Sequence, residues 1–435
     1  MCLAVLTLLL NLWIAPVYAA LNLELTQGVS NQLPIAVLAF TRSNSLDQNS
    51  DVSAIVKNDL SHSGQFKVSS PSLPTLPTLP HSLSHTSTTY WRKQHIDDVV
   101  IGQVKAIDKE HYRVDFSLVN VTQSQNHTLT QQTFTVKKQQ LRRLAHHISD
   151  LIYEKLIGIK GIFSTQIAYI LVTDKNTRNR HYSLQVADMD GYNAKSLLTS
   201  TQPIMSPAWS RNGKRIAYVS FEKILPRVYI QNVSTGKREL ISSYAGINGA
   251  PAWSPDDRTL ALALSKDSAA PKIYLMDLSN KKLRQITYGL SIDTEPSFSQ
   301  DGRSLLFTSD RGGGPQIYQV NIRSGQIHRV TYDGNYNARA SFSSDGKMIV
   351  VLNQEQGSYN IAVQDVDDNI LQILTHSGYD ASPSFAPNGQ MVLYESKPGK
   401  QGLLGIVSVD GRISLRLPTP QGDVQDPTWS PYLLS

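Results

Sequence analysis

A short phrase, Pro-x-Trp-Ser or Pro-x-Phe-Ser with variants, recurs along the chain and constrains its fold more than any other feature. The copies begin at Pro207, Pro251, Pro296, Ala340, Pro383 and Pro427, at intervals of 44, 45, 44, 43 and 44 residues. A tight turn such as Asp301-Gly302 follows most copies, as a two-residue hairpin requires, and further β-type runs come after it. Four short strands in about 44 residues are typical of a β-propeller blade.

Incomplete units at the two ends of the repeat region set the number of blades. Gln166–Ile170 matches a second strand that lacks its phrase, whereas Pro427 begins a first strand that no further strands follow. Each partial unit completes the other, so we predict a six-bladed propeller over 161–435, closed by the C-terminal strand. Closure removes exposed sheet edges. The aromatic residues of the phrase are expected to pack between blades, the alternative being a ligand cage: Trp209, Trp253, Phe298, Phe342, Phe385 and Trp429.

The loops that lead into the innermost strands should surround the axial opening on one face of the propeller. They are residues 205–206, 246–250, 292–295, 335–339, 379–382 and 423–426, in which acidic side chains outnumber the single Arg339. Because binding residues concentrate on such loops, we expect a docking surface for a partner. A cation site in the channel and a solvated rim without function are the alternatives.

Residues 1–20 differ in composition from the rest of the 435-residue chain. An apolar run ends at the small-residue site Val17–Ala20, which predicts a signal peptide; a transmembrane anchor is the alternative. Cys2 is the only cysteine and lies in this leader. The exported chain would therefore have no disulfide, thiolate metal site or cysteine nucleophile.

Residues 21–160 do not repeat and are expected to form a compact α/β domain. Apolar runs predict strands at 34–40, 98–102, 112–118 and 128–136, and helices are expected at 51–60 and 139–158. On the second helix, Arg142, Arg143, His146 and His147 are interpreted as a solvated face. The proline-rich stretch 71–80 predicts an extended loop.

Few features of the sequence indicate catalytic activity. The formal net charge is +6, and the Lys and Arg residues are scattered along the chain rather than clustered, so no nucleic-acid partner is expected. The chain has neither a Gly-x-Ser-x-Gly elbow nor a phosphate-binding glycine loop. Asp293 and Glu295 could form a carboxylate pair of the glycosidase kind, which keeps open a secreted propeller hydrolase acting on cell-wall or sugar substrates. A binding protein without catalytic activity is the favoured interpretation.

Several short segments resemble the TolB family, whose members belong to the Tol-Pal envelope system of Gram-negative bacteria. They are Lys155–Gly161, Asp188–Asn193, Met205–Ser210, Asn248–Pro251, Leu264–Lys266, Thr294–Pro296 and Pro427–Leu433. The resemblance covers the full length. It implies a periplasmic, non-enzymatic adaptor that supports outer-membrane integrity and constriction at cell division. The partners implied are the lipoprotein Pal and TolA, with other outer-membrane or peptidoglycan-linked proteins, and no insertion into a membrane.

The resemblance also implies contact residues. Carried over to matching positions, the Pal contacts fall on Met205, Ala250, Thr294 and Glu295, and the same loops add Ile247, Asn248, Asp293 and Arg339. Family members often have histidine where this chain has Ile247. The TolA contacts fall on the N-terminal segment: Leu21, Asn22, Leu23, Glu24, Leu25 and Thr26. No cofactor is required, although Ca²⁺ in the propeller channel is compatible with the family.

Overall fold

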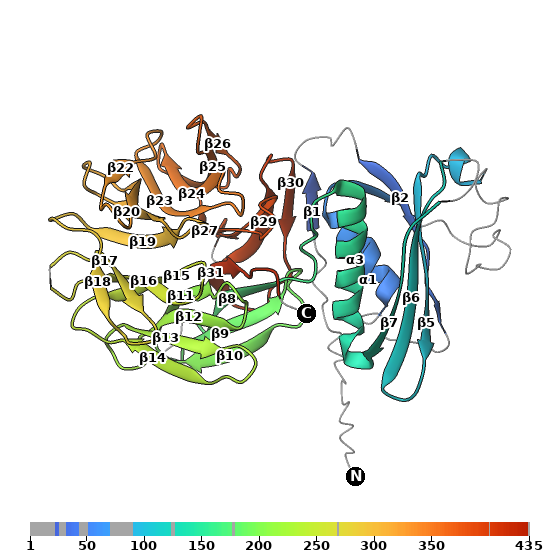
Figure 1. Ribbon diagram of the computed structural model, residues 1–435, viewed down its shortest axis with the longest axis horizontal. Coiled ribbons are helices and arrows are strands. Elements are labelled where there is room, and N and C mark those ends of the chain that lie inside the picture. Colours follow the sequence, from blue (N-terminus) through green and yellow to red (C-terminus); the bar gives the residue numbers. More distant parts are fainter. Residues whose placement is uncertain are drawn as a thin grey trace, which may run out of the picture.

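The structure is a computed structural model that describes residues 22–25, 32–42, 51–69, 90–122, 127–175, 179–267, 269–399 and 401–433. The proposed leader 1–20, the proline-rich stretch 71–80, Leu21 and Thr26 lie outside these ranges. An α/β domain packs beside a six-bladed propeller (Figure 1). The predicted fold class is confirmed. Among the described residues, no helix is both long and apolar enough to cross a membrane.

The N-terminal domain is a mixed sheet with two helices on one face. The sheet order is β4-β2-β5-β6-β7, and β3 also pairs with β5. Its strands are β2 (Leu33–Val37), β3 (Thr41–Arg42), β4 (Phe66–Ser69), β5 (Asp98–Ala106), β6 (His111–Asn120) and β7 (His127–Lys137). The helices are α1 (Val52–His62), the short η2 (Lys138–Gln140) and α3 (Leu141–Ile157).

Local sequence explains where both long helices begin or end. The Asp51 side chain accepts a hydrogen bond from the Ala54 N–H and caps α1. Gly158 ends α3 in the left-handed conformation at φ 80°, which glycine adopts without a steric cost. In α3, apolar residues at helical spacing, among them Leu144, Ile148 and Ile152, pack into the core of the domain.

Six four-stranded antiparallel sheets form the propeller. In the first blade, C-terminal β31 (Asp423–Trp429) pairs with β8 (Gln166–Thr173), which is followed by β9 (His181–Asp188) and β10 (Lys195–Ser200). The second blade contains β11 (Ile204–Trp209), β12 (Arg215–Ser220), β13 (Arg227–Asn232) and β14 (Arg238–Ser242). The third contains β15 (Asn248–Trp253), β16 (Thr259–Leu264), β17 (Lys272–Asp277) and β18 (Leu283–Gln285).

The remaining blades repeat this order. The fourth contains β19 (Asp293–Phe298), β20 (Ser304–Ser309), β21 (Gln316–Asn321) and β22 (Ile327–Arg329). The fifth contains β23 (Tyr336–Phe342), β24 (Met348–Glu355), β25 (Ser358–Asp365) and β26 (Leu371–Ile373). The sixth contains β27 (Asp380–Phe385), β28 (Met391–Ser396), β29 (Leu403–Ser408) and β30 (Ile413–Arg416).

The aromatic residues of the repeated phrase pack between neighbouring blades, as predicted. Trp253 of the third blade lies in one cluster with Ala217 and Val219 of the second. Its indole N–H donates to the backbone carbonyl of Ala208 at 3.0 Å. The phrase therefore stabilises contacts between blades.

The N-terminal segment adds a fifth strand to the sixth blade. Strand β1 (Asn22–Leu25) pairs antiparallel with β30, with Leu23 opposite Leu415 and Leu25 opposite Ile413. The structure places its backbone on the outer edge of a blade, beside the N-terminal domain (Figure 1).

Candidate functional site

All six inner strands share one backbone irregularity, at the residue before the repeated Pro or Ala. These residues have positive φ, and the pairing register shifts beside each of them: Ser206 (51°), Ala250 (45°), Glu295 (52°), Arg339 (55°), Ser382 (53°) and Asp426 (46°). Bulges of this kind redirect a side chain. The six residues line the axial channel, whose cavity measures about 550 Å³.

Arg339 spans the channel. Its Nε lies 3.0 Å from Glu295 Oε1 of the fourth blade, and its Nη1 lies 2.7 Å from Asp426 Oδ1 of the first blade. The same Nη1 donates to the Ser382 hydroxyl of the sixth blade at 2.7 Å. Burial opposes the charged form, but Asp426 and Glu295 outweigh it and raise the pKa of Arg339. Two residues predicted to contact a partner, Arg339 and Glu295, are thus bonded to each other.

Other predicted contact residues lie at the surface around this opening. The side chains of Met205 and Ile247 are 37% and 46% exposed. Ala250 and Thr294 are half-buried. These four residues come from the loops and strand starts of the second, third and fourth blades, so the structure brings them to one side of the propeller.

Two of the predicted contact residues, Asn248 and Asp293, lie beneath the surface with exposures of 1% and 0%. Asn248 Oδ1 accepts from the Ser242 hydroxyl and from the Tyr244 N–H. Asp293 Oδ1 accepts from Arg311 Nη2 at 2.9 Å. Both side chains fix the loop that leads into their own strand, and a contribution to partner binding stays a prediction.

The exposed apolar side chains gather on the propeller face that carries these loops. We call it the open face: it consists of the loops leading into the inner strands, the first residues of those strands, and the loops between the second and third strands of each blade. Thirteen large hydrophobic side chains are exposed in the described part of the chain. Nine of them are on the open face: Met205, Ile224, Leu225, Ile247, Tyr288, Leu290, Ile292, Tyr332 and Tyr379. Exposed apolar side chains that share one face make that face a candidate interaction surface.

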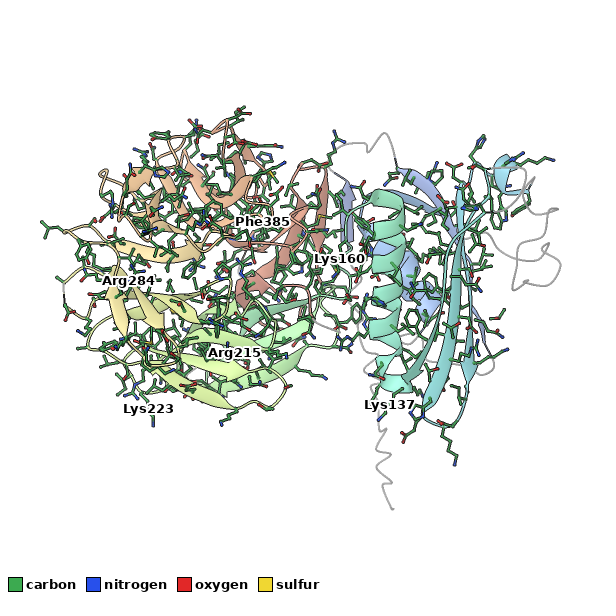
Figure 2. The ribbon with its side chains drawn as sticks, in the orientation of Figure 1. Lys137, Lys160, Arg215, Lys223, Arg284 and Phe385 are labelled. Atoms are coloured by element: carbon green, nitrogen blue, oxygen red, sulfur yellow. The ribbon has the colours of Figure 1, made fainter. Side chains whose placement is uncertain are left out.

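The N-terminal domain contacts the opposite side of the propeller. The backbone carbonyl of Lys160, between the two domains in Figure 2, accepts from Asn388 Nδ2 at 3.3 Å and from the Tyr432 hydroxyl at 3.2 Å. The Lys160 ammonium lies 4.1 Å from the centre of the Tyr432 ring. Asn388 belongs to a turn between first and second strands, and Tyr432 follows β31. The described residues of the N-terminal domain therefore leave the open face uncovered.

An ionic cluster joins the two domains and corrects one prediction. Arg142 and His146 do not form a solvated face, because their side chains are only 13% and 2% exposed. Arg142 pairs with Asp188 and Asp190, from the end of β9 and the turn after it. His146 Nδ1 lies 2.8 Å from Asp59 Oδ2 of α1. Arg143 and His147, on the other side of α3, are exposed as predicted.

The cluster shifts the ionisation of its members. Burial alone would lower the pKa of His146, but the charge of Asp59, its hydrogen bond and the charge of Asp190 together raise that pKa to about 9. Burial raises the pKa of Asp190. Asp59, His146 and Asp190 are also the one group of potential metal ligands that the described residues bring together. Arg142 and Ser149 already bond to its carboxylates.

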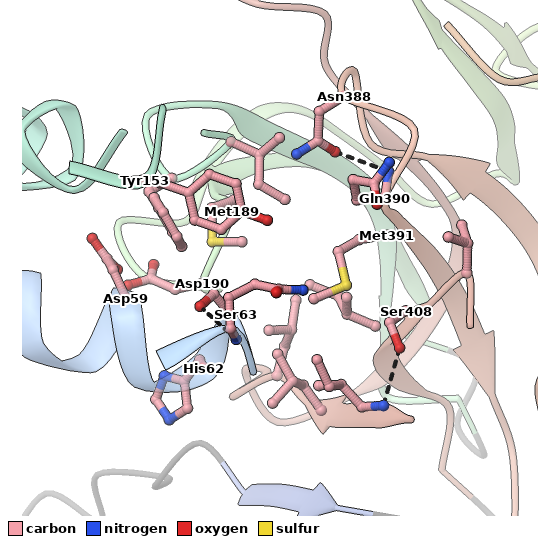
Figure 3. A pocket seen from close by; sticks show the side chains of 18 of the residues that line it. Asp59, His62, Ser63, Tyr153, Met189, Asp190, Asn388, Gln390, Met391 and Ser408 are labelled. Carbon is pink, nitrogen blue, oxygen red and sulfur yellow. Dashed lines mark hydrogen bonds between the residues drawn. The ribbon is translucent and has the colours of Figure 1, made fainter. Parts of the chain in front are cut away.

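A small cavity of about 110 Å³ lies next to this cluster, between the domains (Figure 3). Tyr153 of α3 and Met189 lie on one side of it, and Met391 of the sixth blade lies across from them. Ile413 and Leu415, which pair with β1, contribute to its wall. The cavity is mainly apolar and belongs to the domain interface.

Fold and surface together define a two-domain β-propeller protein with an apolar face that no described part of the chain covers. A family model described as the TolB amino-terminal domain matches residues 21–127, and one described as the TolB beta propeller domain matches residues 153–433. The chain belongs to the TolB family of Tol-Pal system proteins.

Named relatives agree with this assignment. The Tol-Pal system protein TolB of Coxiella burnetii is 52% identical over 96% of this chain and 95% of its own length. That of Legionella pneumophila strain Paris is 51% identical over 100% of both chains. The crystal structure of TolB from Acinetobacter baumannii superposes with a TM-score of 0.84 at 40% identity, covering 95% of this chain and 100% of that one.

Proposed function

We propose that the protein is a periplasmic, non-enzymatic adaptor of the Tol-Pal system that binds Pal through the open face and TolA through the N-terminal segment. In this role it supports outer-membrane integrity and constriction at division. Membership of the TolB family supports the assignment to the Tol-Pal system. The nine exposed apolar side chains on the open face support the binding of a protein partner there. The bonding of Glu295 to Arg339 argues against Glu295 as half of a hydrolytic carboxylate pair.

Substituting Ile247 tests the Pal assignment. An aspartate at this exposed position would place a desolvated charge in the complex, so Ile247→Asp is expected to weaken binding at least tenfold, about 1.4 kcal/mol. Calorimetric titration of the leaderless protein with the soluble domain of Pal from the same organism measures this loss. Ile370→Asp is the matched control, because Ile370 is 66% exposed and lies in a loop on the opposite face. Equal affinities for the two variants, or no binding by the unsubstituted protein, would contradict the assignment.

A cross-link between β1 and β30 tests the TolA assignment. Leu23 and Leu415 are direct partners in the antiparallel pair, so Leu23→Cys/Leu415→Cys can form a disulfide once the leader with Cys2 is absent. We expect the oxidised protein to lose binding to the soluble domain of TolA, because the N-terminal strand is then held on the blade. Reduction should restore binding in the same titration. TolA binding that is as strong in the oxidised as in the reduced protein would place the contact elsewhere.

A further inference from the structure

Strand β7 forms one edge of the N-terminal sheet, beside α3 (Figure 1). The sheet order ends at β7, so no other described strand pairs with its outer side. Its pairing with β6 is regular over the eight residues Thr130–Lys137, after a register shift near the start of the strand. This run contains neither proline nor an acidic residue. Natural proteins usually shorten, charge or bend an exposed edge, and a long regular edge of this kind can accept another strand.

The hydrogen bonds of β7 show which of its residues face this edge. The Lys138 N–H, just after the strand, donates to the Glu110 carbonyl at 2.7 Å. Bonded and non-bonded pairs alternate along an antiparallel ladder. The pair of Lys137 with His111, and every second pair before it, is therefore a non-bonded pair. The N–H and C=O groups of four residues consequently point away from β6: Gln131, Thr133, Thr135 and Lys137.

The surroundings of this edge are basic. Residues 127–149, which form β7, η2 and the first half of α3, include two lysines, two arginines and three histidines but no aspartate or glutamate. Helix α3 runs back beside the strand, so that the His147 ring lies 5.8 Å from the ring of Phe134. Arg143 lies one turn before His147 on the same side of α3. Three cationic side chains of this stretch are exposed: Lys137, Lys138 and Arg143.

We propose that the free edge of β7 binds an extended acidic segment of a partner protein, which adds to the N-terminal sheet as a further strand. Backbone hydrogen bonds to the outward N–H and C=O groups fix the added strand in register. Acidic side chains on its helix side face Arg143, and this charge complementarity selects the segment. The site belongs to a different domain from the open face and to a different sheet from β1, so it does not depend on the Pal and TolA assignments.

The test titrates the full leaderless protein with labelled synthetic peptides of about eight residues, in which either glutamate or lysine alternates with valine. Fluorescence anisotropy should show that the glutamate peptide binds about tenfold or more tightly than the lysine peptide. Hydrogen exchange over residues 127–137 should slow when the glutamate peptide is bound. Thr135→Pro removes one outward N–H and keeps the bonds to β6, so it should weaken binding about tenfold or more. Thr135→Ala keeps that N–H and is the matched control.

Reversing a charge beside the edge tests the acidic character of the partner. Arg143→Glu should weaken binding of the glutamate peptide about tenfold or more, whereas Lys223→Glu, in a loop on the open face, should leave it unchanged. If Thr135→Pro does not fold, the glutamate peptide with alternate backbone nitrogens methylated replaces that variant, and it should not bind the unsubstituted protein.

Four results would overturn the proposal. The first is a glutamate peptide that does not bind, or that binds no more tightly than the lysine peptide. The second is equal binding by Thr135→Pro, or by the methylated peptide. The third is an affinity that Arg143→Glu leaves unchanged. The fourth is a concentration-dependent dimer, seen by analytical ultracentrifugation, that Thr135→Pro abolishes, because the edge would then pair with a second copy of this chain.

Discussion

Replacing Asp293 by alanine is expected to lower the free energy of unfolding by about 3–5 kcal/mol, because it leaves a buried ammonium group unpaired. The Lys272 side chain is 1% exposed, and its Nζ lies 3.4 Å from Asp293 Oδ2. Its other hydrogen bond is to the backbone carbonyl of Ser291, in the loop that Asp293 also fixes. Arg311, which pairs with Asp293 Oδ1, is 23% exposed and can turn toward water.

Thermal unfolding followed by circular dichroism measures this effect, and we expect a fall in Tm of about 5 °C. The double variant Lys272→Met/Asp293→Asn is the control that separates charge from packing. It removes the unpaired charge together with its partner, so it should recover most of the lost stability. If Asp293→Ala costs under about 1 kcal/mol, or if the double variant is the less stable of the two, the charge pair is not what holds this loop.

The repeats explain why so much of the propeller could be predicted. Each blade buries a face only against its neighbours, so a regular spacing of strands and turns is written into the sequence. The burial of Asn248 and Asp293 could also have been predicted from the repeat. Asn337 and Asp380 occupy the same place three residues before the repeated Pro or Ala, and all four side chains are buried. An Asn or Asp that recurs at one position of a repeat indicates a loop anchor before it indicates a binding residue.

The ionic cluster could not be predicted from local sequence, because its members are distant along the chain. His146 lies 87 residues from Asp59 and 44 residues from Asp190. Helix α3 has two buried sides, one packed on its own sheet and one facing the propeller. The spacing of its apolar residues predicts only the side that packs on the sheet. A polar stripe at helical spacing was present in Arg142, His146 and Ser149. This stripe is buried partly against Asp59 of α1 and partly against Asp188 and Asp190 of the propeller, and both contacts form only in the folded protein.

The contribution of His146 to stability is expected to depend on pH. Its pKa is raised from 6.5 to about 9 in the folded protein. The folded state therefore holds the proton more tightly than the unfolded state. This contribution, about 3 kcal/mol, is complete below about pH 6.5 and is lost as the pH rises through about 9. The groups that face the ring are Asp59 and Ser149, with Asp190 and Arg142 on its other side.

The comparison of His146→Gln with the unsubstituted protein isolates this contribution. Glu395 and Asp150 also titrate with raised pKa values, about 7 and about 6, but both proteins contain them and their effects cancel in the difference. Denaturant unfolding between pH 6 and 9.5 should show a stability difference that shrinks by about 3 kcal/mol as the pH rises. His147→Gln, on the exposed side of the same helix, should show no such trend.

The variant Asp190→Asn tests whether protonation of His146 stabilises the contact between the two domains or only the N-terminal domain itself. Asp190 comes from the propeller, with its Oδ2 3.8 Å from His146 Nε2, whereas Asp59 comes from α1. Removing the Asp190 charge should lower the pKa of His146 and narrow the pH range over which stability falls. A pH dependence that is unchanged in Asp190→Asn would assign the whole effect to Asp59. The domain contact would then rest on Arg142 and the apolar wall beside it, and would not respond to the protonation of His146.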